Sequence, residues 1–81
     1  MHYVYLLKSK NNNFVYTGFS SDLRKRFIEH NLGKVKSTKF YKPFDLIYYE
    51  AYNNKTSALK RELEIKNNSQ QKEILFKRLG L

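Results

Sequence analysis

The sequence predicts an α+β domain in which a small three-stranded sheet is flanked by three helices, in the order β-β-α-β-α-α. Two short segments rich in aromatic and branched residues open the chain, and a third lies in its middle, as is typical of strands. Segments with helical periodicity follow the second and third strands, bounded by capping residues and glycine. A length of 81 residues suits a single domain over residues 1–81.

The first two predicted strands form a hairpin. His2–Ser9 alternates in polarity, and Phe14–Thr17 is a second short strand that ends at Gly18. Lys10–Asn13 separates them and consists of residue types that are common in turns. Phe44–Tyr52 is the third strand, and the helices must cover the resulting sheet to bury its apolar surface.

Capping residues mark the three helices. The expected helices run from the caps Ser20, Ser21 and Asp22 to about Leu32, from Thr56 or Ser57 to about Lys66, and from Ser69 to about Leu79. Gly33 and Gly80 follow the first and last helices, where a left-handed C-terminal residue is expected. Asn67 and Asn68 separate the second helix from the third.

The charge of the chain favours a polyanionic partner. Sixteen Lys and Arg against seven Asp and Glu give a net charge of +9. Nucleic acid is the first candidate and an anionic membrane the second, whereas a merely solubilising lysine surface is the alternative explanation. Four lysines and two aromatic residues share one acid-free segment: Lys34, Lys36, Lys39 and Lys42, with Phe40 and Tyr41. Such a mixture suits phosphate contacts and base stacking, and no amphipathic helix supports membrane binding.

The absence of cysteine excludes disulfides, thiol catalysis and zinc sites built from cysteine. No charged segment followed by an apolar one opens the chain, so we expect no signal peptide and a cytoplasmic protein. The default expectation for its oligomeric state is a monomer. The sequence also lacks a His and carboxylate cluster for zinc, a Ser-His-Asp grouping and a Gly-rich phosphate loop.

Two polar residues share one edge of the first predicted helix. At about 100° per residue, Leu23, Phe27 and Ile28 form the stripe that faces the core, and Arg26 and His30 flank it. Arg26 is either a functional cation or a side chain whose methylenes pack while its charge stays in water. His30 is either catalytic or a hydrogen-bonding partner at the helix end.

The second predicted helix places a carboxylate among apolar residues. Its apolar arc is outlined by Ala58, Leu59, Leu63 and Ile65. Glu62 and Lys66 fall inside this arc, where a carboxylate is costly unless a cation meets it. The cation is either Lys66, through an i,i+4 ion pair, or a metal ion held by Glu62 in a cleft.

Tyr5 and Tyr16 lie on the two strands of the predicted hairpin. Because side chains alternate between the faces of a strand, an even-length hairpin loop places both tyrosines on the same face. Each tyrosine taken alone is simply a core or rim aromatic.

In combination, these residues resemble the GIY-YIG endonuclease superfamily. Tyr3–Tyr5 stands at the first motif, with Tyr3 in place of its glycine, and Tyr16–Gly18 stands at the second. Arg26, His30 and Glu62 follow in the family's order and spacing. Nearly the whole chain is similar to the family's short, stand-alone bacterial branch, called UPF0213.

The resemblance implies a metal-dependent endonuclease that hydrolyses DNA phosphodiester bonds, in DNA repair or processing. It implies that Glu62 holds one Mg²⁺ or Mn²⁺ ion and that Arg26 stabilises the negative charge of the phosphorane-like transition state. It also implies that either Tyr16 or Tyr5 helps to take the proton from the attacking water, and that His30 belongs to the same catalytic set. We therefore expect Tyr5, Tyr16, Arg26 and Glu62 to face one shared pocket.

We expect nucleic acid, DNA first and RNA as the alternative, to bind through five lysines: Lys34, Lys36, Lys39, Lys42 and Lys66. The rival function is a non-catalytic nucleic-acid-binding module on the same scaffold. Binding alone needs only the lysines, whereas catalysis also needs Glu62. A third interpretation is a basic structural protein in which Glu62 and Lys66 form a packing ion pair.

Overall fold

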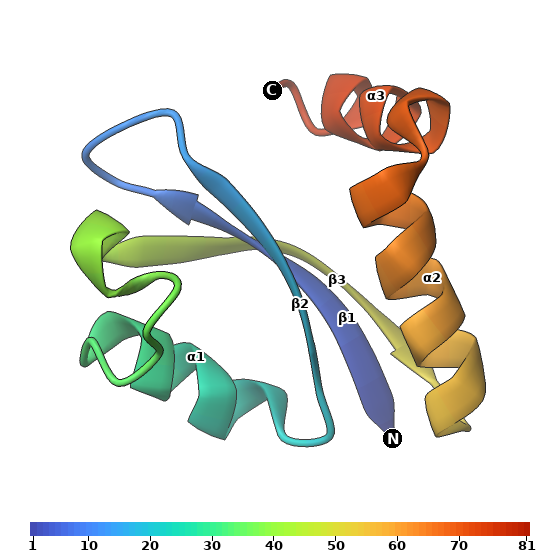
Figure 1. Cartoon of the computed structure of the whole chain (residues 1–81), viewed down its shortest axis with the longest axis horizontal. Coiled ribbons are helices and arrows are strands. Elements are labelled where there is room, and N and C mark those ends of the chain that lie inside the picture. Colours follow the sequence, from blue (N-terminus) through green and yellow to red (C-terminus); the bar gives the residue numbers. More distant parts are fainter.

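The computed structural model describes residues 1–81 and confirms the α+β class and the predicted order of elements (Figure 1). Its elements are β1 (His2–Ser9), β2 (Val15–Ser20), α1 (Leu23–Asn31), a 3₁₀ turn (Lys39–Tyr41), β3 (Phe44–Tyr52), α2 (Lys55–Asn67) and α3 (Ser69–Arg78). The three strands form one antiparallel sheet in the order β2-β1-β3, so the first strand is central.

The helices cover opposite faces of this sheet (Figure 1). On one face α2 and α3 enclose an aliphatic core: Val4, Leu6, Ala58, Ile65 and Leu75. On the other face α1 and the segment after it cover a smaller, aromatic core: Tyr5, Leu7 and Phe44, with Phe14, Tyr16, Leu23, Phe27 and Leu46 packed against it. The alternation of side chains along β1 therefore gives the domain two separate cores.

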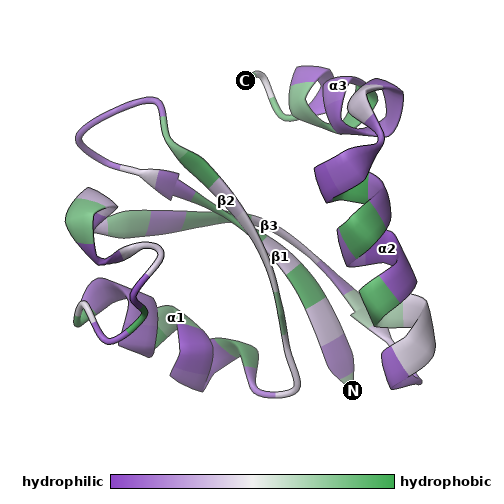
Figure 2. Ribbon diagram, viewed as in Figure 1, coloured by the Kyte–Doolittle hydropathy of each residue, from purple (hydrophilic) through white to green (hydrophobic).

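Hydropathy follows this two-sided arrangement. The turn between β1 and β2 is hydrophilic, and hydrophobic stretches of α2 alternate with hydrophilic ones along the helix (Figure 2). No helix combines the length and the apolar character that crossing a bilayer requires.

The second strand and two helix caps differ from the sequence prediction. The β2 strand continues through Gly18 to Ser20, because Gly18 pairs with Tyr5 in the ladder and does not end the strand. Asn54 caps α2, two or three residues earlier than predicted, and Asn68 caps α3, one residue earlier than predicted. Their side-chain oxygens accept backbone N–H groups of the first turn, as a good cap does.

Three residues predicted to face a core are exposed instead. The exposed fraction is 50% for Ile28, 36% for Leu59 and 55% for Leu63. The helical phase was right for Phe27, Ala58 and Ile65, but each helix contacts the sheet through a narrower stripe than the sequence pattern spans.

Candidate active site

Tyr5 lies at the centre of the candidate site, in the middle of β1. Tyr5 is only 1% exposed, and its ring crosses Gly18 of β2, the residue directly opposite. A Cβ added at Gly18 would overlap the end of the Tyr5 ring and lie 2.8 Å from Cε2 of Tyr16. Glycine at this position therefore makes room for the tyrosine, and Tyr5 and Tyr16 lie on the same face as predicted, with ring centroids 6.3 Å apart.

His30 is the hydrogen-bonding partner of Tyr5. It is fully buried in the last turn of α1, and its Nε2 lies 2.8 Å from the Tyr5 hydroxyl. Its Nδ1 lies 2.7 Å from Oγ1 of Thr38, and that hydroxyl donates to the Val35 carbonyl. Because Thr38 uses its proton on Val35, it accepts from Nδ1–H of His30, and Nε2 is then free to accept the Tyr5 proton.

Burial and electrostatics keep this pair neutral. Burial, and then the charge of Arg26, lower the pKa of His30 to about 4. Burial and the neighbouring Tyr16 raise the pKa of Tyr5 to about 12, although the Arg26 guanidinium acts in the opposite direction. At neutral pH, Tyr5 is therefore a phenol that donates its hydrogen bond to an uncharged imidazole.

Arg26 projects from α1 beside the Tyr5 hydroxyl, on the flank predicted from its helical phase. Its one ion pair is with Glu29, at 3.4 Å, and 38% of its side chain is exposed. It lines an open cavity of about 350 Å³ together with Lys25 and Glu29 and the Phe19–Asp22 segment. The guanidinium is thus held by the protein on one side and remains accessible from the other.

Tyr16 connects this cluster to α2. The ammonium of Lys66 lies 5.9 Å from the centroid of the Tyr16 ring, a cation–π distance, and 3.3 Å from Oε2 of Glu62. The Glu62 side chain is only 15% exposed, whereas that of Lys66 is 41% exposed. The charge of Glu62 also contributes to the raised pKa of Tyr5, so the carboxylate belongs to the same electrostatic environment.

The expectation of one shared pocket is not met. No cavity of the structure is lined by Tyr5, Tyr16, Arg26 and Glu62 together. The residues instead form a row of contacts from α1, through the hairpin, to α2. The reason is that α1 and α2 pack on opposite faces of the sheet, so their functional side chains approach one another around the hairpin.

The predicted lysines lie apart from this row, except for Lys66. Lys34, Lys36, Lys39 and Lys42 are all exposed in the segment after α1, and none forms an ion pair. Lys39 lies 5.1 Å from the centroid of the Phe40 ring, which is itself 83% exposed. Both features are compatible with a surface for nucleic acid.

One carboxylate is available for a divalent metal. No three His, Asp or Glu residues form a group that would hold an ion by themselves. Glu62 uses Oε2 for Lys66 and has no hydrogen-bonding partner at Oε1. A single carboxylate fits a Mg²⁺ site of the kind completed by water and substrate phosphate, and does not fit a cage made of protein ligands alone.

Sequence reasoning missed the residues that support the cluster. Thr38 sets the tautomer of His30, and Gly18 accommodates Tyr5. Asn31 fixes the end of α1 to β3, since its Oδ1 accepts the backbone N–H of Phe44 at 2.7 Å. The glycine within the second motif was the one available signal, because a glycine inside a strand often marks a close approach.

The family model described as the GIY-YIG catalytic domain matches residues 1–74. A UPF0213 protein from Staphylococcus saprophyticus is 46% identical over 74 residues, which cover 90% of this chain and 89% of that protein. UPF0213 proteins from Staphylococcus epidermidis and Staphylococcus aureus are 45% and 42% identical over the same shares.

The fold also has a counterpart among solved structures. The solution NMR structure of a UPF0213 protein from Bacillus halodurans matches with a TM-score of 0.55 and 32% sequence identity. The match covers 91% of this chain and 81% of that one.

Proposed function

The chain belongs to the GIY-YIG family, and on that premise we propose that it is a metal-dependent endonuclease that hydrolyses DNA phosphodiester bonds. The observation that carries the proposal is the row of contacts His30–Tyr5–Tyr16–Lys66–Glu62, with Arg26 beside Tyr5. This row combines a cation for phosphate oxygens, a phenolic hydroxyl for water and a carboxylate for a metal. Phosphodiester hydrolysis requires these three kinds of group.

Arg26 binds the scissile phosphate. Its guanidinium presents several N–H donors in a plane, and its partly exposed side chain can place them on two phosphate oxygens. The charge that develops on those oxygens in the transition state strengthens this interaction, and that gain accelerates the reaction.

Tyr16, and not Tyr5, meets the attacking water. The Tyr5 hydroxyl is buried, donates to His30 and has a pKa of about 12, which makes it a positioning group for Arg26. The Tyr16 hydroxyl forms no hydrogen bond within the protein and its side chain is partly exposed, so it is free to accept one from water. Lys66, beside the Tyr16 ring, adds positive charge where the water must lose its proton.

Glu62 would hold the divalent ion, Mg²⁺ or Mn²⁺, through its unpartnered Oε1. When bound there, such an ion supplies a Lewis acid for the phosphate oxygens. Lys66 keeps the carboxylate oriented by its ion pair with Oε2 and neutralises part of its charge.

The rival function is a binding module without catalysis, in which Glu62 and Lys66 form only a packing pair. The exposure of Lys66 argues against it, because an exposed i,i+4 pair is worth about 0.3–0.5 kcal/mol and does not explain a carboxylate that is 15% exposed. A role in DNA repair or processing, in the cytoplasm, completes the proposal, and DNA is its nucleic acid.

The test is a nicking assay on supercoiled plasmid and on single-stranded DNA, with Mg²⁺, Mn²⁺ or EDTA. We expect the purified protein to cleave DNA with either metal and not with EDTA, and we expect Glu62→Gln to remove this activity while DNA binding persists. Metal-dependent cleavage that Glu62→Gln leaves unchanged would refute the assignment of Glu62. Specific binding without any cleavage by the wild-type protein would favour the binding module.

A further inference from the structure

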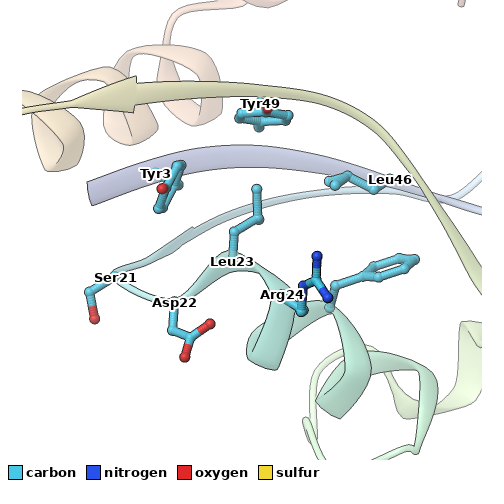
Figure 3. Close-up of a pocket in the computed structure, with 8 residues that line it drawn as sticks. Tyr3, Ser21, Asp22, Leu23, Arg24, Leu46 and Tyr49 are labelled. Carbon is cyan, nitrogen blue, oxygen red and sulfur yellow. The ribbon is translucent and has the colours of Figure 1, made fainter. Parts of the chain in front are cut away.

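A second cavity, of about 510 Å³, lies on the face of the sheet that α1 covers (Figure 3). Its apolar lining consists of Tyr3, Leu23, Phe27, Leu46 and Tyr49, and Arg24 lies at its edge. The volume is within the range of small-molecule sites, and this lining is richer in aromatic side chains than that of the other cavities.

This cavity is a neighbour of the candidate active site. Tyr49 is the register partner of Tyr5 across β1 and β3, and Tyr3 lies two residues before Tyr5 on the same face of β1. Ser21 and Asp22 line both this cavity and the open cavity beside Arg26. A strand whose phosphate lies at Arg26 therefore reaches the aromatic cavity by crossing the N-terminal end of α1.

The lining has the chemistry of a stacking site. Tyr49 is 55% exposed, and its ring meets Tyr3 edge-on with the centroids 6.1 Å apart, so the accessible part of its surface is not used for internal packing. Arg24 forms no ion pair within the protein and is free for a phosphate. Tyr3 stands where the first family motif has its glycine, so this wall of the cavity exists because of that replacement.

The polar edge does not oppose an anionic strand. The Asp22 carboxylate accepts the backbone N–H of Lys25 as the cap of α1 and points away from Tyr49 (Figure 3). The Ser21 hydroxyl also points away from Tyr49 (Figure 3), on the side of the cavity that faces Arg26, where it can contact a sugar or a phosphate of the strand. The net charge of +9 attracts the strand as a whole.

We propose that this cavity takes one unpaired DNA base next to the phosphate that is cut. Aromatic side chains bind bases by stacking without regard to sequence, but a base within a duplex is already stacked on its neighbours. The substrate class is therefore DNA with single-stranded positions at the cleavage point. This inference rests on the proposed endonuclease function, which it deepens.

A fluorescence experiment tests the inference without any cleavage. The chain contains no tryptophan, so Tyr49→Trp introduces a single reporter into the cavity. In EDTA, we expect an oligothymidine of about eight nucleotides to quench this reporter, since a strand of that length spans a typical single-strand site. An abasic strand of equal length should quench it far less. Equal quenching by both strands would show that no base enters the cavity and would overturn the proposal.

Binding by ring-deleted variants provides a second, independent readout. Tyr49→Ala should weaken binding of the oligothymidine roughly 5- to 150-fold and leave abasic-strand binding unchanged, because stacking on one ring is lost. Tyr49→Phe should bind within about twofold of wild type. Ile74→Ala is the matched control, since Ile74 is 48% exposed on α3, away from the cavity. Wild-type affinity in Tyr49→Ala would refute the inference.

The two proposals fail separately. If the protein cleaves single-stranded DNA and Glu62→Gln abolishes this, but Tyr49→Ala changes nothing, the base-binding inference is wrong and the endonuclease stands. If oligothymidine quenches Tyr49→Trp but no metal supports cleavage, the cavity binds a base and the catalytic proposal is wrong, and with it the substrate class.

Discussion

Two glutamates at the α2 side of the sheet are buried to the same degree, but the protein provides them with different partners. Glu50, on β3, is 16% exposed at its side chain and contacts α2, whereas Glu62, on α2, is 15% exposed. Burial is thus the same for both carboxylates. The difference lies in how many partners the fold provides for each.

Both oxygens of the Glu50 carboxylate have hydrogen-bonding partners within the protein. Its carboxylate accepts the hydroxyls of Tyr48 and Tyr52 and the Nε–H of Arg61, at 3.0 Å to Oε1, and Arg61 also pairs with Glu64. Burial alone would raise the pKa of Glu50, but the hydrogen bonds from Arg61 and the two tyrosines outweigh it and hold the pKa below its usual value. This network joins α2 to β3 and engages both oxygens of the Glu50 carboxylate.

Only one oxygen of the Glu62 carboxylate has a partner within the protein. Lys66 pairs with Oε2 of Glu62, whereas Oε1 has no hydrogen-bonding partner. The Tyr16 hydroxyl also has none, and the one ion pair of Arg26, with Glu29, is 3.4 Å long. None of these atoms is fully buried, so water or a ligand can complete their interactions. The comparison teaches that, in this domain, incomplete satisfaction and not burial distinguishes a functional carboxylate from a structural one.

The largest predicted effect on stability is the pH dependence due to His30, which lies on the face of the sheet that α1 covers. The unfolded chain protonates this histidine near pH 6.5, whereas the folded protein resists protonation until about pH 4. The unfolded state therefore binds more protons between these values, and stability rises as pH increases from 4 to 6.5 and then levels off. The total gain is about 3 kcal/mol, at roughly 1.4 kcal/mol per pKa unit.

The His30→Gln variant should lose that pH dependence. Chemical unfolding at several pH values between 4 and 7, for wild type and variant, measures the difference directly and cancels the contribution of other acids such as Glu50. Parallel pH profiles for the two proteins would show that His30 is not the buried neutral group described here.

Gly18→Ala should destabilise the domain by about 2–3 kcal/mol, because the added methyl overlaps the buried Tyr5 ring. Thr17→Ala is the matched control on the opposite face of the same strand, where Thr17 pairs with Leu6. It removes atoms without overpacking and should cost about 1 kcal/mol. Thermal or urea unfolding compares the two, and an equal or larger loss in Thr17→Ala would contradict the account of Gly18.

Thr38→Val should cost about 1–2 kcal/mol, because the buried Nδ1–H of His30 loses its acceptor without any change in volume. Thr38→Ser retains the hydroxyl and should restore most of the loss. On the other face, Tyr52→Phe should cost less, since Glu50 still has Tyr48 and Arg61. Urea midpoints measure all three, and a costlier Tyr52→Phe would reverse the comparison.

The smallest effect on stability belongs to the lysines after α1. Replacing Lys34, Lys36, Lys39 and Lys42 together by glutamine should change the free energy of unfolding by less than about 0.5 kcal/mol per site. DNA binding should nevertheless weaken, and its slope of log K against log salt should fall by up to roughly 3.6, at 0.9 for each lost contact with a duplex phosphate. An unchanged salt slope would place the nucleic-acid surface elsewhere.

Local patterns in the sequence were enough for the strands β1 and β3, for the flanking position of Arg26 and for the largely buried position of Glu62. The extension of β2 through Gly18 was not predictable in this way, because it depends on a ring from another strand filling the space above the glycine. The exposure of Ile28 was missed for a similar reason, since a helical wheel gives direction but not the width of the contact. The role of Thr38 could not be predicted from the sequence, because it arises only when the segment after α1 folds back onto His30.

The most direct test of the central claim replaces each glutamate by glutamine and measures both unfolding and metal-dependent nicking. Glu50→Gln should lower the free energy of unfolding by about 1–3 kcal/mol, and the folded variant should still cleave within about tenfold of wild type. Glu62→Gln should change stability by less than about 0.5 kcal/mol and reduce cleavage by more than roughly 100-fold. A destabilised Glu62→Gln protein that still cleaves DNA at the wild-type rate would contradict the account.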